Sequence, residues 1–171
     1  MPDDYILQWG SPALYELARP VEVFDDLLRA QARRLSRRLQ AANGAGLAAT
    51  QVGSLRRMFA FRFTPEHAPD VLVNPRIVWR SREHAVFTEG CLSFDSVVVA
   101  VRRPYAVRVV GYDVDGGARE LECEDFGASL LQHEIDHLDG ILTLHRAEPV
   151  ERYRAMSELL AHDAGRLSQA G

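Results

Sequence analysis

The sequence contains no lysine, so all 20 of its basic residues are arginine. This absence excludes Schiff-base, pyridoxal-phosphate and lysine-nucleophile chemistry, and it excludes a complete P-loop. Cysteine is scarce as well, because Cys91 and Cys123 are too few for a disulfide-rich secreted scaffold. No apolar run approaches the length of a membrane span, and the acidic start at Asp3 and Asp4 lacks the order of a signal peptide.

The remaining composition is that of an ordinary globular domain. The chain has 171 residues, of which 47% are hydrophobic and 26% charged, and this length can bury a core without disulfides. Its net charge of −4 argues against a general nucleic-acid binder, which needs a broad basic surface. We therefore expect one domain over residues 1–171, a cytoplasmic location, and neither a membrane nor a specific nucleic acid as partner.

Apolar spacing predicts three helices, one of them following a series of strands. The first spans 25–41, the second spans 126–138 with Asp125 as its N-cap, and the last spans 150–162. The first helix places four apolar residues on one face, namely Leu28, Ala32, Leu35 and Leu39. The apolar face expected for the last helix consists of Tyr153, Met156, Leu159 and Leu160.

The middle of the chain is rich in β-forming residues. Separate strands are expected at 58–63, 71–73 and 77–79, and a short buried run at 97–101. A hairpin is expected from Tyr105 to Asp125 around an Asp-Gly turn, with Leu121 and Cys123 on its buried face. This order of elements predicts an α+β fold in which antiparallel sheets pack around the central helix.

The most informative stretch is His133-Glu134-Ile135-Asp136-His137, which matches H-E-x-x-H. Residues four apart lie on one face of a helix, so both imidazoles can bind one metal ion. Glu134 can then reach a water molecule whose pKa the metal lowers to about 7, and act as general base and acid. The competing interpretation is a chance pair of histidines, but flanking leucines fit a helix packed into a core.

Two histidines leave a catalytic metal site incomplete, because such sites usually have three protein ligands and one open position. A metzincin is excluded, since Thr143 stands where its third histidine belongs. A later glutamate, Glu151 or Glu158, would complete a thermolysin-like zinc endopeptidase. A cysteine is the other candidate for the third ligand. The position of Cys123 in the hairpin is typical of a small buried apolar residue, whereas Cys91 follows a glycine in E-G-C-L-S.

A glycine-rich loop follows the first helix. It contains G-x-G, but Ala49 stands where a dinucleotide fingerprint needs its third glycine, and no strand precedes it. The loop is either a simple helix stop or a segment whose backbone approaches a ligand. In the second case Gln51 supplies an amide donor for a developing oxyanion.

Taken together, three stretches of the sequence resemble peptide deformylases. The signatures G-x-G-L-A-A-x-Q, E-G-C-L-S and Q-H-E-x-D-H stand at 44–51, 89–93 and 132–137, and the resemblance covers nearly the whole chain. It implies a metal-dependent hydrolase that removes the formyl group from N-formylmethionine at the N-terminus of newly made polypeptides. The implied partners are N-formylated nascent peptides, with a transient contact to the ribosome.

The resemblance also implies roles for individual residues. Three of them would bind one divalent metal ion, typically Fe(II) with zinc, nickel or cobalt as substitutes: Cys91, His133 and His137. Glu134 would be the general base and then the general acid, while the Gln51 side chain and the Leu92 backbone N–H stabilise the oxyanion. Gly46 would bind substrate through its backbone, and Glu89 would pair with Arg103. An alternative is a catalytically silent homologue, against which Glu134 and Gln51 argue because a structural metal site needs neither.

The sequence departs from the family around the expected substrate pocket. Asp95 lies near the place where many members have a proline, and a valine run that includes Val98 replaces a basic residue. Ala45 is smaller than the usual branched residue, and Ser129 is polar where the methionine pocket is often apolar. We therefore expect a pocket unlike that of a typical housekeeping enzyme, lined by Ala45, Phe87, Phe126, Ser129 and Leu130. Equal rates on formyl-Met, formyl-Leu and formyl-Phe peptides would argue against a methionine-selective pocket.

Overall fold

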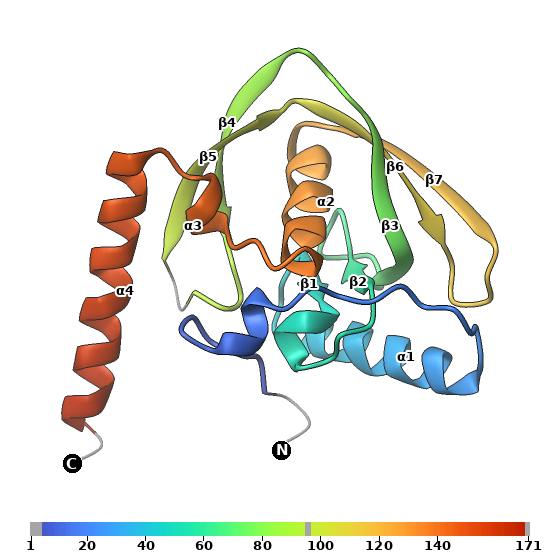
Figure 1. Ribbon diagram of the computed structural model, residues 1–171, viewed down its shortest axis with the longest axis horizontal. Coiled ribbons are helices and arrows are strands. Elements are labelled where there is room, and N and C mark those ends of the chain that lie inside the picture. The colour runs from blue at the N-terminus through green and yellow to red at the C-terminus, as the bar shows by residue number, and fades with distance from the viewer. Residues whose placement is uncertain (1–4, 95–96, 170–171) are drawn as a thin grey trace.

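The helix that carries H-E-x-x-H lies at the centre of the molecule (Figure 1). This helix, α2 (Asp125–Leu138), has every side chain from Ala128 to Leu138 buried. The structure is a computed structural model that describes residues 5–94 and 97–169. Asp95 and the acidic start at Asp3 and Asp4 therefore lie outside the described residues.

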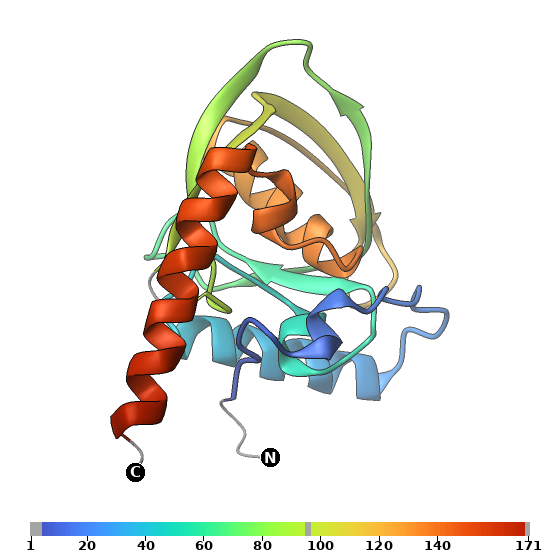
Figure 2. The same cartoon turned by 60° about the vertical axis from the view of Figure 1, so that its left-hand side comes forward.

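Two antiparallel sheets enclose α2 (Figures 1 and 2). The larger sheet has the strand order β1-β2-β3-β6-β7, and β4 pairs with β5 in the smaller one. The strands of the larger sheet are β1 (Gly46–Ala48), β2 (Met58–Phe61), β3 (Asp70–Arg80), β6 (Ala106–Tyr112) and β7 (Ala118–Glu124). Those of the smaller sheet are β4 (His84–Gly90) and β5 (Val98–Pro104). The predicted α+β fold with antiparallel sheets around a central helix is confirmed.

The core around α2 explains why the helix is fixed so firmly. Its apolar side chains, among them Leu131, Ile135 and Leu138, pack in one cluster with Phe59 and Val109 of the larger sheet. Burying each such side chain contributes about 1.5–3 kcal/mol, so the helix cannot shift without a large cost. The backbone that carries the two histidines is therefore rigid.

The strand β3 replaces the two separate strands expected at 71–73 and 77–79. Pro75 has no N–H to donate, and the pairing of β3 with β6 shifts register between Val73 and Arg76. Asn74 adopts a left-handed φ of 51° there, and its side-chain amide exchanges two hydrogen bonds with the backbone of Val21. The irregularity thus bends one continuous strand instead of ending it.

Several other local expectations changed by small amounts. The predicted helix at 25–41 appears as α1 (Asp26–Ala41), capped by the Asp25 carboxylate, which accepts from the Leu28 N–H at 2.8 Å. The N-cap of α2 is Glu124 and not Asp125, which begins the helix. The hairpin is confirmed, although Leu121 and Cys123 are only half-buried. The run at 97–101 was expected to be buried, but Val98 is 45% exposed.

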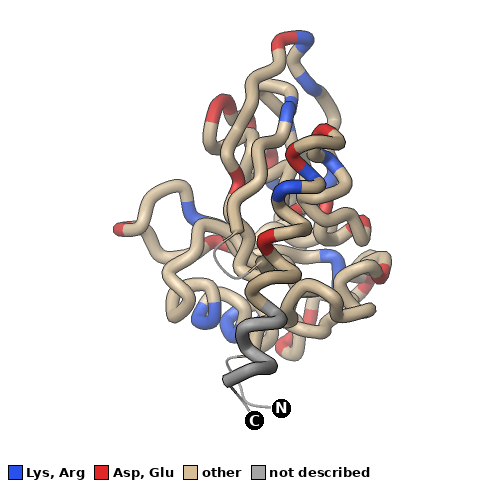
Figure 3. Tube along the Cα trace, turned by 90° about the vertical axis from the view of Figure 1, so that its left-hand side faces the viewer, with Lys and Arg blue, Asp and Glu red and all other residues tan. Residues whose placement is uncertain are grey.

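The last helix, α4 (Pro149–Gln169), follows the short helix α3 (Thr143–Arg146) and lies at the edge of the molecule (Figures 1 and 2). Of its predicted apolar face only Leu159 is buried, and it packs with Ala155, which was not predicted, against β5 and α3. The prediction is wrong for Tyr153, Met156 and Leu160, which are 76%, 38% and 57% exposed. Acidic and basic positions are interspersed over this side of the molecule (Figure 3). Within the described residues, no helix has the length and apolar character needed to cross a membrane.

Candidate metal and catalytic site

The three predicted metal ligands come together from two parts of the fold. Cys91 directly follows β4, while His133 and His137 lie one turn apart on α2. Their ligand atoms all lie within 4.8 Å of one another, and Cys91 Sγ is 3.2 Å from His137 Nε2. One thiol and two imidazoles are the donor types of a catalytic zinc-type site with one open position.

The alternative in which a later glutamate completes the site is wrong. Glu151 and Glu158 both lie on α4, which packs against β5 and α3. The Glu151 carboxylate accepts from the Ala100 N–H at 2.8 Å and from Arg154, and Glu158 also pairs with Arg154. Both carboxylates are therefore engaged away from the two histidines.

Burial and neighbouring groups shift the pKa values of the two histidines in opposite directions. The pKa of His133 lies well above its ordinary value: burial lowers it, but hydrogen bonds to Cys91 and Glu89 outweigh that effect. The pKa of His137 lies well below its ordinary value because of burial and the nearby positive charges, which keeps that imidazole neutral as a metal ligand requires. Among the described residues, Glu134 Oε2 and His137 Nδ1 are buried without a hydrogen-bond partner. The thiol and the two imidazoles that converge here are donors that fit a divalent metal ion.

The Glu89 carboxylate connects the two histidine-bearing turns to the rest of the protein. Its predicted pairing with Arg103 is confirmed, because the guanidinium donates to both carboxylate oxygens. Its Oε2 also accepts from His133 Nδ1 at 3.0 Å, and its Oε1 accepts from Ser129 Oγ at 2.7 Å. Burial alone would raise the pKa of Glu89, but the hydrogen bonds from His133 and Arg103 lower it to about 2. Glu89 is therefore an anion enclosed by donors.

The sequence analysis missed the continuation of this network. Arg103 also donates to Asp136 at 2.8 Å, and the Asp136 carboxylate accepts two hydrogen bonds from Arg146. Asp136 is buried although it is charged, so it requires such partners. A signal was present, because an aspartate between the two histidines on a buried helix face needs a cation.

Glu134 lies in the most confined part of the site. Its side chain faces Gly46 of β1, where an added Cβ would lie only 2.6 Å from Glu134 Cδ. Burial raises the pKa of Glu134 to about 7; the positive charge of His133 opposes this rise and the negative charge of Glu89 adds to it. The glycine therefore provides the room that the buried carboxyl group occupies.

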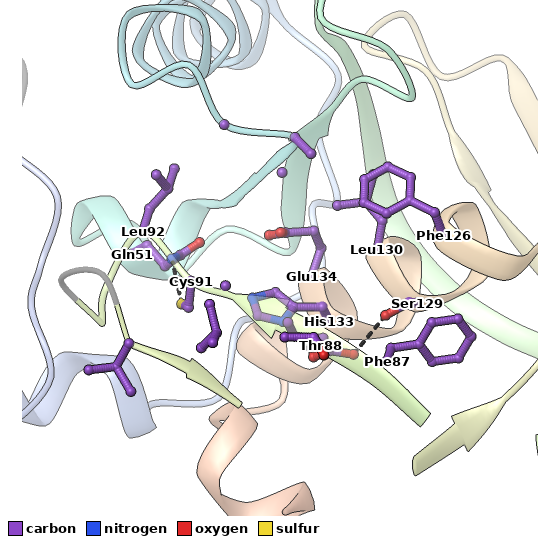
Figure 4. A pocket seen from close by; sticks show the side chains of 17 residues that line it. Gln51, Phe87, Thr88, Cys91, Leu92, Phe126, Ser129, Leu130, His133 and Glu134 are labelled. Atoms are coloured by element: carbon purple, nitrogen blue, oxygen red, sulfur yellow. Dashed lines mark hydrogen bonds and ion pairs between the residues drawn. The ribbon is translucent and has the colours of Figure 1, made fainter. Parts of the chain in front are cut away.

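Gln51 lies in the turn η2 (Ala49–Val52), and its side-chain amide has a fixed orientation. Its Oε1 accepts from the Ala48 N–H at 2.8 Å, so its Nε2 must point the other way. That nitrogen donates to Ser93 Oγ at 3.0 Å and lies 3.7 Å from Cys91 Sγ. Figure 4 shows Gln51, Cys91, His133 and Glu134 around the same space.

A cavity of about 430 Å³ opens beside these groups. It is lined by every predicted catalytic and substrate-binding residue, namely Ala45, Gly46, Gln51, Phe87, Glu89, Leu92, Phe126, Ser129, Leu130 and Glu134. Phe126 is 53% exposed and forms part of its rim. The lining also includes residues that the sequence analysis did not assign to the site: Gly44, Thr88, Gly90, Val97 and Val98.

The fold and the site together define the class of the protein as a metal-dependent hydrolase. Two histidines on a helix and a third donor from a loop can hold a metal ion, and a carboxylate beside them faces a cavity. The family model for polypeptide deformylase matches residues 4–153. The chain is 40% identical over 151 residues to a protein named peptide deformylase-like from Rhizobium meliloti, covering 88% of each. It is 40% identical over 144 residues to a peptide deformylase from Brucella suis, covering 82% of each.

The solved structures agree with these sequence relatives. A crystal structure of a peptide deformylase from Legionella pneumophila superposes with a TM-score of 0.88 at 34% identity, covering 97% of this chain and 96% of that one. The chain belongs to the polypeptide deformylase family. Members of this family are enzymes, and their activity is the metal-dependent removal of the formyl group from nascent peptides.

Proposed function

We propose that this chain hydrolyses the formyl group of N-formylmethionine at the N-terminus of newly made polypeptides, with residues 1–171 acting as one catalytic domain. The observation that carries the proposal is the convergence of Cys91, His133 and His137 beside the buried carboxyl group of Glu134, on a cavity of about 430 Å³. The apolar side chains of Phe87 and Leu130 in its lining suit an uncharged side chain such as that of methionine.

Cys91, His133 and His137 would hold the metal ion. When bound, a divalent cation supplies Lewis-acid chemistry that makes water a nucleophile near neutral pH. We propose Fe(II) as the native metal, as the resemblance to the family implies, with zinc, nickel or cobalt as substitutes that imidazole and thiolate donors also accept.

Glu134 would move the proton. The attacking water forms a bond to the formyl carbon and gives a proton to Glu134, whose Oε2 has no hydrogen-bond partner in the described part of the chain. The C–N bond then breaks, formate leaves, and the same proton passes to the peptide amine. Such general acid–base catalysis contributes about 10²–10⁴-fold to the rate.

Two donors would stabilise the charge that develops on the formyl oxygen. They are Gln51 Nε2, held in orientation by Ala48, and the backbone N–H of Leu92. One such donor contributes about 2.7–4 kcal/mol to transition-state stabilisation. The backbone of Gly46, which also lines the cavity, would bind the peptide main chain.

Formate release tests the activity. The protein is loaded anaerobically with Fe(II) or Ni(II), given a formyl-Met tripeptide, and compared with Glu134→Gln at equal metal content. We expect a loss on the order of 10²–10⁴-fold in the variant. Equal rates would remove Glu134 from the chemistry. No release by wild-type protein that holds one metal equivalent would support the catalytically silent homologue instead.

The ligand assignment has a matched control, because the chain contains two cysteines. Cys91→Ser should lose bound metal, whereas Cys123→Ser should retain it, since Cys123 lies half-buried on β7. Metal content after gel filtration measures both variants. Equal retention by the two would contradict Cys91 as a ligand.

We further propose that the protein acts in the cytoplasm and contacts the ribosome transiently. The supporting argument is chemical: its proposed substrate is a formylated chain that has only just been made. Co-sedimentation with translating ribosomes should exceed that with ribosomal subunits lacking nascent chains, and equal amounts in both would oppose the contact.

A further inference from the structure

Ser129 lies on α2 exactly one helical turn before His133, at the wall of the cavity. The sequence predicts a polar group in the substrate pocket here, but the hydroxyl points elsewhere. Ser129 is 5% exposed, and its Oγ donates to Glu89 Oε1 at 2.7 Å, as the dashed line from Ser129 in Figure 4 shows. Because the proton of the hydroxyl is used inside the protein, the side chain offers no donor to a substrate.

The carboxylate that receives this hydrogen bond also holds His133. Glu89 Oε2 accepts from His133 Nδ1 at 3.0 Å, which leaves Nε2 of that imidazole to bind a metal. Arg103 of β5 donates to both oxygens. Each carboxylate oxygen thus accepts two hydrogen bonds, and Ser129 provides the only one of the four that comes from a neutral hydroxyl.

We propose that Ser129 is a positioning residue of the metal site: its hydroxyl orients Glu89, and Glu89 in turn orients His133. Arg103 pairs with the carboxylate as a planar unit, and it reaches α2 only through a second residue, Asp136. The hydroxyl of Ser129 projects from the same helix as His133. Its hydrogen bond therefore fixes the Glu89 carboxylate directly to the helix that carries this metal ligand. The inference rests on the proposed function only in taking His133 as a metal ligand.

Metal affinity is the direct measurement. Substitutions of residues that orient a ligand typically weaken metal binding by about 10–100-fold. We expect Ser129→Ala to weaken Zn(II) binding by about 10-fold in competition with a chelator, since it acts through one intermediate residue. Ser129→Thr retains a hydroxyl and should restore the affinity. Ser157→Ala is the matched control, because that exposed serine of α4 donates to the Tyr153 carbonyl of its own helix.

Two further measurements separate positioning from a general loss of structure. In Co(II)-loaded protein, Ser129→Ala should change the visible absorption of the metal centre, whereas Ser129→Thr and Ser157→Ala should not. In a Glu89→Gln background, Ser129→Ala should have no additional effect on metal affinity, because its route through the carboxylate is already altered.

Several outcomes would overturn the proposal. Unchanged metal affinity in Ser129→Ala would show that the hydroxyl is not needed, and a full additional loss in the Glu89→Gln background would show another route. A raised KM for formyl-Met peptide with unchanged metal affinity would place Ser129 in substrate binding. The metal-affinity and absorption results are independent of whether the wild-type protein releases formate, so failure of the proposed function would be recognised separately.

Discussion

Helices α2 and α4 are both surrounded by arginine–carboxylate pairs, but the pairs have opposite environments. Beside α2, Arg103 joins Glu89 and Asp136, and all three side chains are at most 9% exposed. On α4, Arg154 joins Glu151 and Glu158 while its own side chain is 40% exposed. Water screens the α4 pairs, whereas each buried charge near α2 depends on its partner. Arginine–carboxylate pairing therefore orders the metal-binding site beside α2, whereas on α4 it helps to hold a peripheral helix in position.

The largest effect is expected where a buried charge loses its partner. Arg103→Met should lower the free energy of unfolding by about 3–5 kcal/mol, because the buried carboxylates of Glu89 and Asp136 both lose the guanidinium that they share. Arg108→Met is the control: Arg108 pairs with Glu122 at 3.1 Å on exposed strands, so its loss should cost less than about 1 kcal/mol. Urea unfolding measures both, and equal losses would contradict the contrast between buried and exposed pairs.

Packing around α2 is tight enough that one methyl group should displace a functional side chain. In Gly46→Ala the new Cβ would overlap the Glu134 carboxyl group, which must move. We expect kcat/KM for formyl-Met peptide to fall on the order of 100-fold, as for a reacting group misplaced by about 1 Å. Gly90→Ala, whose Cβ would meet only Val98 Cγ1 at 4.0 Å, should lose much less. Equal losses would show that Gly46 does not make room for Glu134.

The comparison of the two helices also shows which parts of the fold the sequence could predict. The α2 helix was predicted nearly to the residue, because an acidic residue marks its start and its leucines flank the H-E-x-x-H motif. The α4 face was predicted correctly only at Leu159, because polar contacts help to decide which side faces β5. Glu151 accepts from the Ala100 N–H, and Arg152 donates to the Leu144 carbonyl. Strand β4 was not predicted, because its one fully buried side chain is the charged Glu89. A charged residue at a buried position hides the apolar–polar alternation that indicates a strand.

The site likewise has a part that the sequence could predict and a part that it could not. The metal-binding cluster was predictable because spacing on one helix places His133 and His137 together, and the choice of Cys91 over a later glutamate came from the family motif. The orienting contacts of Glu89 with Ser129 and His133 were not predictable. They depend on how β4 lies beside α2, which no local pattern specifies.

A smaller effect is expected for the core contact of α4. Leu159 is 3% exposed whereas its neighbour Leu160 is 57% exposed. Leu159→Ala should destabilise the docking of α4 by about 2 kcal/mol, while Leu160→Ala should change it by less than about 0.5 kcal/mol. Hydrogen exchange of the α4 amides reports this local opening. Equal exchange in both variants would mean that polar contacts alone hold the helix.

The smallest effect is a pH dependence of the same docking. Hydrogen bonds from Arg154 and the Ala100 N–H lower the pKa of Glu151 to about 2, below its unfolded value of about 4.3. The folded state therefore favours the ionised carboxylate, so its stabilising contribution is complete above about pH 4.3 and is lost as the pH falls toward 2. The amide resonance of Ala100 should titrate with a midpoint near 2 while α4 stays docked, and Glu151→Gln should abolish that titration. A midpoint at the ordinary value would show that water, and not Ala100 and Arg154, solvates this carboxylate, and that α4 is held by Leu159 without help from charge.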